Sequence, residues 1–153
     1  MKIIRDTREK QPLSFKSEAV VKKLETGDYS LEGLEDKITV ERKGSITEVY
    51  NNFTEKRFWN EMERIRSYPY RYIIFEFSVE DMENVPYSLR LPKAVWSRLK
   101  ISPKYLFSCV RKLQYDYGII VLFVNNRAKS SQIIEDILTR LHDKLNESSQ
   151  ECN

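Results

Sequence analysis

The sequence predicts an α/β fold in which helices flank a mixed β-sheet. Short strand-like runs recur along the 153-residue chain, and segments with apolar residues at helical spacing separate several of them. The composition, 41% hydrophobic and 32% charged, suits one compact domain with an ordinary core. We therefore expect one domain over residues 1–147 and a polar tail over residues 148–153.

In the first half of the chain, short strands alternate with helices. The predicted elements are a strand over residues 2–5, a turn-rich segment over 6–14, a helix over 17–27, strands over 29–34 and 37–43, and a helical region after residue 45 that includes 57–65. Ser17 is the expected N-cap of the first helix, and Gly27 lies near its end. A tight acidic link joins the next two strands, which predicts an antiparallel hairpin. Ser45 and Glu48 have the S-x-x-E spacing of a capping box, which predicts the next helix start.

The second half continues the alternation. The predicted elements are a strand over residues 71–77, an acidic loop over 79–84, a helix that starts at 103, an apolar strand over 118–124 and a last amphipathic helix that starts at 131. Ser102 and Pro103 suit the N-cap and first position of the helix that Gly118 closes. Ser131 opens the last helix, whose apolar residues recur at helical spacing. The order β-α-β-β-α-β-α-β-α implies a mixed sheet covered by helices.

Charge and special residues narrow the classes of function. A net charge of +3 is only mildly basic, so it permits a nucleic-acid partner without demanding one. Two cysteines and one histidine make neither a disulfide framework nor a zinc site. The charged N-terminus has no signal-like apolar region, and no apolar run is long enough to span a bilayer. We expect a soluble intracellular protein of the cytoplasm or nucleus, with no membrane partner.

The strand-like run over residues 38–43 carries charges where a strand ordinarily buries apolar residues. Alternate side chains of a strand share a face, so Glu41 and Lys43 point one way and Arg42 the other. Hydrolysis of a phosphodiester needs a hard cation held by carboxylate oxygens, and a nearby ammonium can hold the attacking water or stabilise the transition state. The predicted hairpin brings Asp28 beside Glu41 as a second carboxylate. Taken alone, the E-R-K run also suits a charged surface strand.

Several ordered motifs extend this pattern. They are DTRE at residues 6–9, GDY at 27–29, VERK at 40–43 and RFWNEMERIR from residue 57. Together they resemble the nuclease domain of the XPF family, a branch of the PD-(D/E)xK nuclease superfamily, over about residues 1–145. The resemblance implies a restriction-endonuclease-like core, so that residues 1–147 are expected to form an XPF-type nuclease domain. It also implies a metal-dependent endonuclease that cuts branched DNA or junctions between duplex and single strand.

The resemblance assigns roles to individual residues. It implies that Asp28 and Glu41 bind Mg²⁺ or Mn²⁺, with the backbone carbonyl of Arg42 as an extra ligand. Lys43 is implied as the catalytic base or as a stabiliser of charge. The three catalytic residues are therefore expected to be Asp28, Glu41 and Lys43.

The resemblance also implies roles for residues that surround these three catalytic residues. Asp6 and Glu9 are expected near the metal or in contact with the hairpin, and Arg8 is expected to meet phosphate. Two departures from the family pattern are present. The Asp that stands four residues after the lysine is replaced by Thr47, which is followed by Glu48. Glu48 is either a substitute acid or only a capping residue, and no Gly-rich hairpin that could build a helix-hairpin-helix module follows the domain.

Basic residues indicate where DNA could lie. The segment 90–112 holds seven basic and no acidic residues, which suits either a phosphate-binding track or a solvated helix face. Arg57 and Arg64 follow the site on a helix, where they can contact phosphate or pair with Glu61. The candidate DNA-binding residues are Arg8, Arg42, Arg57, Arg64, Lys100 and Lys104, and the candidates for base stacking are Tyr29 and Tyr50.

Two other functions fit the same residues. A non-catalytic DNA-binding or scaffolding subunit would retain the fold with a degraded metal site, and Thr47 favours that alternative. A nuclease that acts on RNA or on single-stranded ends would use the same metal chemistry. Because no helix-hairpin-helix module is present, we expect weak DNA binding by a monomer and a gain from a homodimer or a partner subunit. The brevity of the chain suits a virus-encoded protein.

Overall fold

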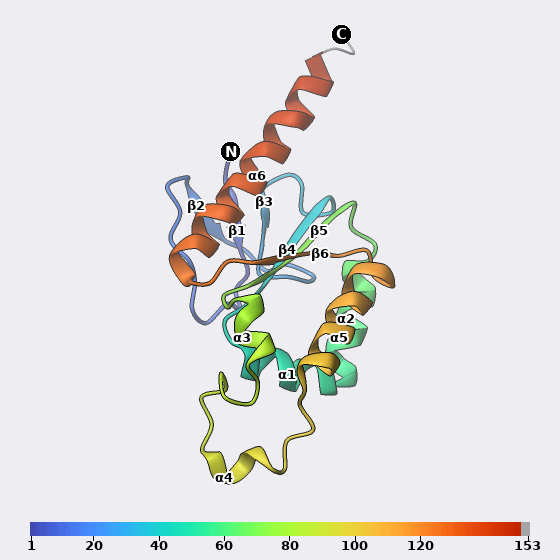
Figure 1. Ribbon diagram of the computed structural model, residues 1–153. Helices are drawn as coiled ribbons and strands as arrows, with labels where there is room; N and C mark the ends of the chain where they lie inside the picture. Colours follow the sequence, from blue (N-terminus) through green and yellow to red (C-terminus); the bar gives the residue numbers. More distant parts are fainter. Residues whose placement is uncertain (151–153) are drawn as a thin grey trace.

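A six-stranded mixed sheet forms the centre of the protein in the computed structural model, which describes residues 1–150 (Figure 1). The strands are β1 (Ile3–Arg5), β2 (Ala19–Val21), β3 (Tyr29–Leu31), β4 (Ile38–Lys43), β5 (Tyr70–Phe75) and β6 (Ile120–Phe123). Their order across the sheet is β2-β1-β3-β4-β5-β6. β3 is antiparallel to both β1 and β4, and all other neighbours are parallel. The predicted mixed sheet and the predicted antiparallel hairpin are confirmed.

Helices cover both faces of this sheet. They are α1 (Ile46–Thr54), α2 (Lys56–Ile65), α3 (Val79–Glu83), α4 (Lys93–Trp96), α5 (Pro103–Tyr115) and α6 (Arg127–Gln150). Neighbouring residues of β5 point to opposite faces, so Ile73 and Phe75 pack with α1, α2 and α5, whereas Ile74 packs with α6. Figure 1 shows α6 crossing the β1–β3 side and extending beyond the sheet. Within residues 1–150, no helix combines the length and apolar character needed to cross a membrane.

Two predicted helix starts occur where the sequence places their caps. The Ser45 hydroxyl accepts the N–H of Glu48 at the start of α1, at 3.2 Å. The Ser102 hydroxyl accepts the N–H of Tyr105 at 3.1 Å, with Pro103 in the first turn of α5. These local signals succeed because a cap is satisfied within its own four residues.

The helix predicted over residues 17–27 is wrong. Residues Ala19–Val21 form β2, which runs parallel to β1 with Ile3 opposite Ala19. The N–H of Ser17 donates to Glu135 on α6 at 2.6 Å, so Ser17 does not cap a helix. The β-branched residues Val20 and Val21 pair with β1, which is distant from them in the sequence. Local periodicity does not reveal such a partner.

Three further differences concern helix boundaries. The acidic segment predicted as a loop forms α3, because Ser78 and Asp81 make a reciprocal capping box. The short helix α4 lies within a segment for which the sequence predicted no element. The last helix begins at Arg127 rather than at Ser131, whose hydroxyl donates to the backbone carbonyl of Ser14.

Candidate active site

The β3–β4 hairpin brings two carboxylates together. Tyr29 pairs with Val40 in the antiparallel register, and the N–H of Asp28 donates to the Val40 carbonyl at 2.9 Å. Asp28 therefore lies opposite Glu41 on the same face of the sheet. The preceding residue, Gly27, has φ +80° and a Cβ there would overlap the Thr39 hydroxyl oxygen. Glycine is thus required for the tight approach that delivers Asp28 to this position.

Lys43 lies on the same face of β4 as Glu41. Its ammonium is 2.8 Å from Glu41 Oε1 and 5.6 Å from the centre of the Phe58 ring on α2. Burial lowers the pKa of Lys43, but the Glu41 and Glu48 carboxylates raise it more, so the net pKa lies above its usual value. The amine therefore stays protonated and presents a fixed positive charge.

The two carboxylates are electrostatically strained. Burial raises the pKa of Asp28, and the negative charge of Glu41 raises it further, although a hydrogen bond from the Arg42 N–H at 2.8 Å opposes both. Burial is also the main reason that the pKa of Glu41 is raised, and Lys43 only partly offsets it. A cation between these carboxylates would relieve the strain, because it stabilises their charged forms.

The residues present fit a hard divalent cation that retains waters. No set of three histidine, cysteine, aspartate or glutamate side chains within residues 1–150 is arranged to hold an ion alone. Mg²⁺ commonly takes only one or two carboxylates together with waters and phosphate oxygens, and Asp28 and Glu41 match that number. The Arg42 N–H faces Asp28. Its carbonyl lies on the same edge of β4, because N–H and C=O of one strand residue point to the same neighbour in antiparallel pairing.

Two glutamates on helices border the same carboxylate pair. Glu48 accepts the Gly44 N–H at 2.9 Å rather than the Ser45 N–H expected of a capping box, and its other oxygen is 3.7 Å from the Lys43 ammonium. Glu61 on α2 accepts the Thr26 hydroxyl at 3.2 Å, and its charge contributes to the raised pKa of Glu41. From the sequence alone, Glu61 is recognisable only as a helix ion-pair partner, because nothing local reveals that α2 covers the hairpin.

The guanidinium of Arg42 points to the opposite face and is 7% exposed. It donates to Glu76 at 2.8 Å and to the Gln11 carbonyl at 2.9 Å, and it reaches Glu9 at 3.4 Å. Arg127 donates to the same Gln11 carbonyl at 3.0 Å. The charge of Arg42 is therefore shared by two carboxylates, and contact of its side chain with DNA stays a prediction. Glu76 and Arg127 carry no local sequence signal of this role, because only the fold brings them here.

Comparison with known proteins identifies the family of this chain. The family model described as the ERCC4 domain matches residues 5–137, which include Asp28, Glu41 and Lys43. The chain belongs to the ERCC4 domain family. Members of this family are nucleases. None of the curated proteins matches the chain.

Two solved structures share the fold of this ERCC4 domain. XPF from Aeropyrum pernix matches with a TM-score of 0.71 and 22% identity, over 98% of this chain and 69% of that chain. XPF from Aeropyrum pernix in complex with DNA matches with a TM-score of 0.68 and 25% identity, over 94% of this chain and 65% of that chain. The ERCC4 domain thus spans about two thirds of the length of these structures. The matches confirm the predicted α/β fold with its restriction-endonuclease-like core.

The residues of the DTRE motif in this ERCC4 domain differ in their surroundings: Asp6 is buried, whereas Arg8 is exposed. Asp6 accepts the Arg8 guanidinium and the Leu24 N–H, each at 2.6 Å, so it ties the end of β1 to the segment before β3. The Glu9 side chain is 9% exposed and Arg8 is exposed, and both line the cavity that holds Asp28. The hydrogen bonds of Asp6 fit the positioning role that the resemblance implies, and that role stays a prediction.

The other candidate DNA-binding residues of the ERCC4 domain are exposed but dispersed. Arg57 and Arg64 lie on the outer side of α2, and Arg64 borders a separate cavity. Lys100 precedes α5 and Lys104 lies in its first turn. Of the described residues that line the cavity around Asp28, none is among these four.

The two tyrosines expected to stack on bases have other surroundings. Tyr29 is 0% exposed, and its hydroxyl accepts the N–H of Leu13 at 3.0 Å, so that expectation is wrong. Tyr50 on α1 is partly buried and packs against the core that α1, α2 and α5 share with the sheet. Their aromatic rings therefore serve packing.

Proposed function

We propose that this ERCC4 domain is a metal-dependent DNA endonuclease that hydrolyses phosphodiester bonds, at branched DNA or at junctions between duplex and single strand. One observation carries the proposal: Asp28, Glu41 and Lys43 line a single open cavity of about 560 Å³. Membership in a nuclease family supports it, as does the DNA complex described for a structural relative. The cavity is open and its lining is mostly polar, which suits a phosphate backbone.

The residues of this cavity would divide the work as follows. Asp28, Glu41 and the Arg42 carbonyl would hold Mg²⁺ or Mn²⁺, and such an ion supplies Lewis-acid stabilisation and activates water. Lys43 remains charged, so it would stabilise negative charge on the phosphoryl oxygens rather than accept a proton. Arg8 is exposed at the rim and would contact a flanking phosphate.

A non-catalytic DNA-binding subunit is the second candidate, and Thr47 is the residue that favours it. Thr47 borders a neighbouring cavity rather than the one that holds Asp28. Glu48, which follows it, lies beside Lys43 and keeps a carboxylate near the reacting face. This placement supports catalysis, because a carboxylate at the rim can hold metal-bound water.

The test is cleavage of labelled flap, fork, duplex and single-stranded DNA and of matched RNA, in Mg²⁺, Mn²⁺ or EDTA at low and stated salt. We expect metal-dependent cutting that is lost in EDTA and in Lys43→Ala. Lys2→Ala is the matched control, because Lys2 lies at the far end of β1, where it pairs with Glu18. DNA binding by the wild-type protein without cutting of any substrate would refute the proposal and support the non-catalytic subunit.

A further inference from the structure

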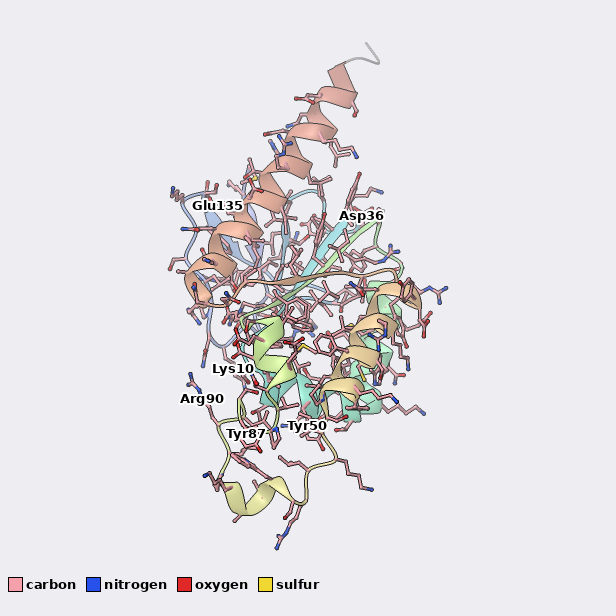
Figure 2. The ribbon with its side chains drawn as sticks, viewed as in Figure 1. Lys10, Asp36, Tyr50, Tyr87, Arg90 and Glu135 are labelled. Atoms are coloured by element: carbon pink, nitrogen blue, oxygen red, sulfur yellow. The ribbon has the colours of Figure 1, made fainter. Side chains whose placement is uncertain are left out.

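The segment between α3 and α5 projects from the body of the protein as an arm (Figure 1). We define the arm as residues 84–102, which include α4. The arm carries an aromatic pair: Tyr87 near its root (Figure 2) and Trp96 on α4 meet edge to face, with ring centres 5.2 Å apart. The Trp96 indole N–H donates to the Leu91 carbonyl at 3.1 Å, which fixes the orientation of the ring. The arm therefore presents an aromatic surface whose ring orientation is fixed by these contacts.

Tyr87 is not needed to anchor the arm. Its neighbours Val85 and Leu89 are buried in the core, at 7% and 5% exposure, whereas Tyr87 is 75% exposed. A tyrosine that only packed against the fold would lose most of its accessible surface. An exposed aromatic ring on a projecting segment is instead suited to stacking against a planar group of a binding partner.

The positive charge of the arm indicates that its binding partner is negatively charged. Residues 84–102 contain four basic and no acidic side chains, and all four basic residues are exposed. In the described part of the chain, none of these four takes part in an ion pair. The Lys93 ammonium lies 5.9 Å from the Trp96 ring centre, so positive charge adjoins the aromatic surface. Aromatic rings interleaved with unpaired cations match the bases and phosphates of an unpaired nucleic-acid strand.

A second cavity connects the arm with the active site. It has a volume of about 480 Å³ and is bordered by Ser88 and Arg90 at the root of the arm. Gly44 and Glu76 border both this cavity and the one that holds Asp28. Figure 2 shows Tyr87 and Arg90 at the root of the arm, below α3. A strand that leaves the active site could therefore continue along this cavity to the arm.

The acidic side chains along this route are already engaged. Glu76 accepts the Arg42 guanidinium at 2.8 Å. Asp81 accepts the Ser78 N–H at 2.8 Å in the cap of α3. Their charges are partly offset by these partners, so repulsion of a phosphate backbone is reduced.

We infer that the arm binds an unpaired stretch of DNA beside the cleavage site, with one base stacked on Tyr87 and its phosphates near Arg90 and Lys93. Every base has a π-face, so such stacking tolerates any sequence. In a duplex the bases already stack on one another, and the arm would therefore distinguish single strand from duplex. The route into the active site rests on the proposed nuclease function, but binding of a single strand to the arm does not.

The test measures binding in EDTA, where cutting cannot contribute. Fluorescence anisotropy is recorded with oligothymidylate, a fork and a blunt duplex, for the wild type, Tyr87→Ala and Tyr87→Phe. Tyr115→Ala on α5 is the matched control, because Tyr115 is 82% exposed and lies outside the arm. We expect Tyr87→Ala to weaken binding of single strand and fork about tenfold, the size of one lost stacked base, and to leave duplex binding unchanged. Tyr87→Phe and Tyr115→Ala should bind all three as the wild type does.

Two results would overturn the inference. Wild-type affinity of Tyr87→Ala for single strand and fork would show that no base stacks on the ring. An equal loss for the blunt duplex would show a general effect instead of a single-strand site. Thermal unfolding of each variant confirms its fold. Failure of the nuclease proposal appears separately, as absence of metal-dependent cutting by the wild type, whatever the anisotropy shows.

Discussion

Replacement of Arg42 by alanine should destabilise this ERCC4 domain strongly. The guanidinium is 7% exposed, and its two carboxylate partners, Glu9 and Glu76, are each 9% exposed. It also donates to the Gln11 carbonyl at 2.9 Å, which orients the segment after β1. Arg42→Ala would leave two buried carboxylates close together without the cation that they share.

The magnitude follows from this burial. Removal of one partner from a buried ion pair costs about 3–5 kcal/mol, because the remaining charge is left desolvated. Arg42 has two such partners, of which Glu76 is the closer at 2.8 Å, so we expect a loss of about 4 kcal/mol in the free energy of unfolding. A domain of this size has a total stability of about 5–15 kcal/mol, so the variant should be only marginally folded.

The assay is urea unfolding at neutral pH, followed by tryptophan fluorescence and far-ultraviolet circular dichroism. Arg111→Ala is the control, because Arg111 is exposed on α5 and its loss should change stability by less than about 0.5 kcal/mol. A triple variant, Arg42→Met with Glu9→Gln and Glu76→Gln, should recover much of the loss because no unpaired charge remains. Equal stabilities of Arg42→Ala and the wild type would refute the assignment of Arg42 to the interior network.

Three further predictions concern the same region. Gly27→Ala should lower stability by roughly 1–3 kcal/mol, since φ +80° and the Thr39 hydroxyl leave no room for a Cβ; an unchanged melting temperature would contradict this. Burial alone would raise the pKa of Asp6, but hydrogen bonds from a guanidinium and two backbone N–H groups hold it below the ordinary 3.8. The stabilisation that the Asp6 carboxylate gives should therefore be present above pH 3.8 and be lost as pH falls through the lowered pKa. The difference in free energy of unfolding between the wild type and Asp6→Asn should thus be larger at about pH 6 than at about pH 3. A difference that is independent of pH would contradict the hydrogen-bond network of Asp6. Asp28→Asn should raise the melting temperature without metal, because the repulsion with Glu41 is removed, and should abolish the rise that Mg²⁺ gives the wild type; an equal Mg²⁺ response of both proteins would exclude Asp28 as a ligand.

The elements that the sequence predicted correctly are those whose causes are local. Ser45 and Ser102 cap helices through bonds that close within four residues. The β3–β4 hairpin follows from two strand-like runs and a short link between them. The strand β2 was missed because its partner, β1, lies sixteen residues away in register, with Ile3 opposite Ala19. A backbone hydrogen bond between such distant residues leaves no periodic signal in either segment.

The sequence by itself determined the chemistry of the candidate site. Alternation along a strand is a property of the backbone, so E-R-K necessarily places Glu41 and Lys43 on one face and Arg42 on the other. What each face meets was decided only by tertiary structure, because α2 packs beside Lys43 on the first face and the segment after β1 contacts Arg42 on the second. Burial then raised the pKa of Asp28 and of Glu41, because partial removal from water disfavours the charged form of each carboxylate.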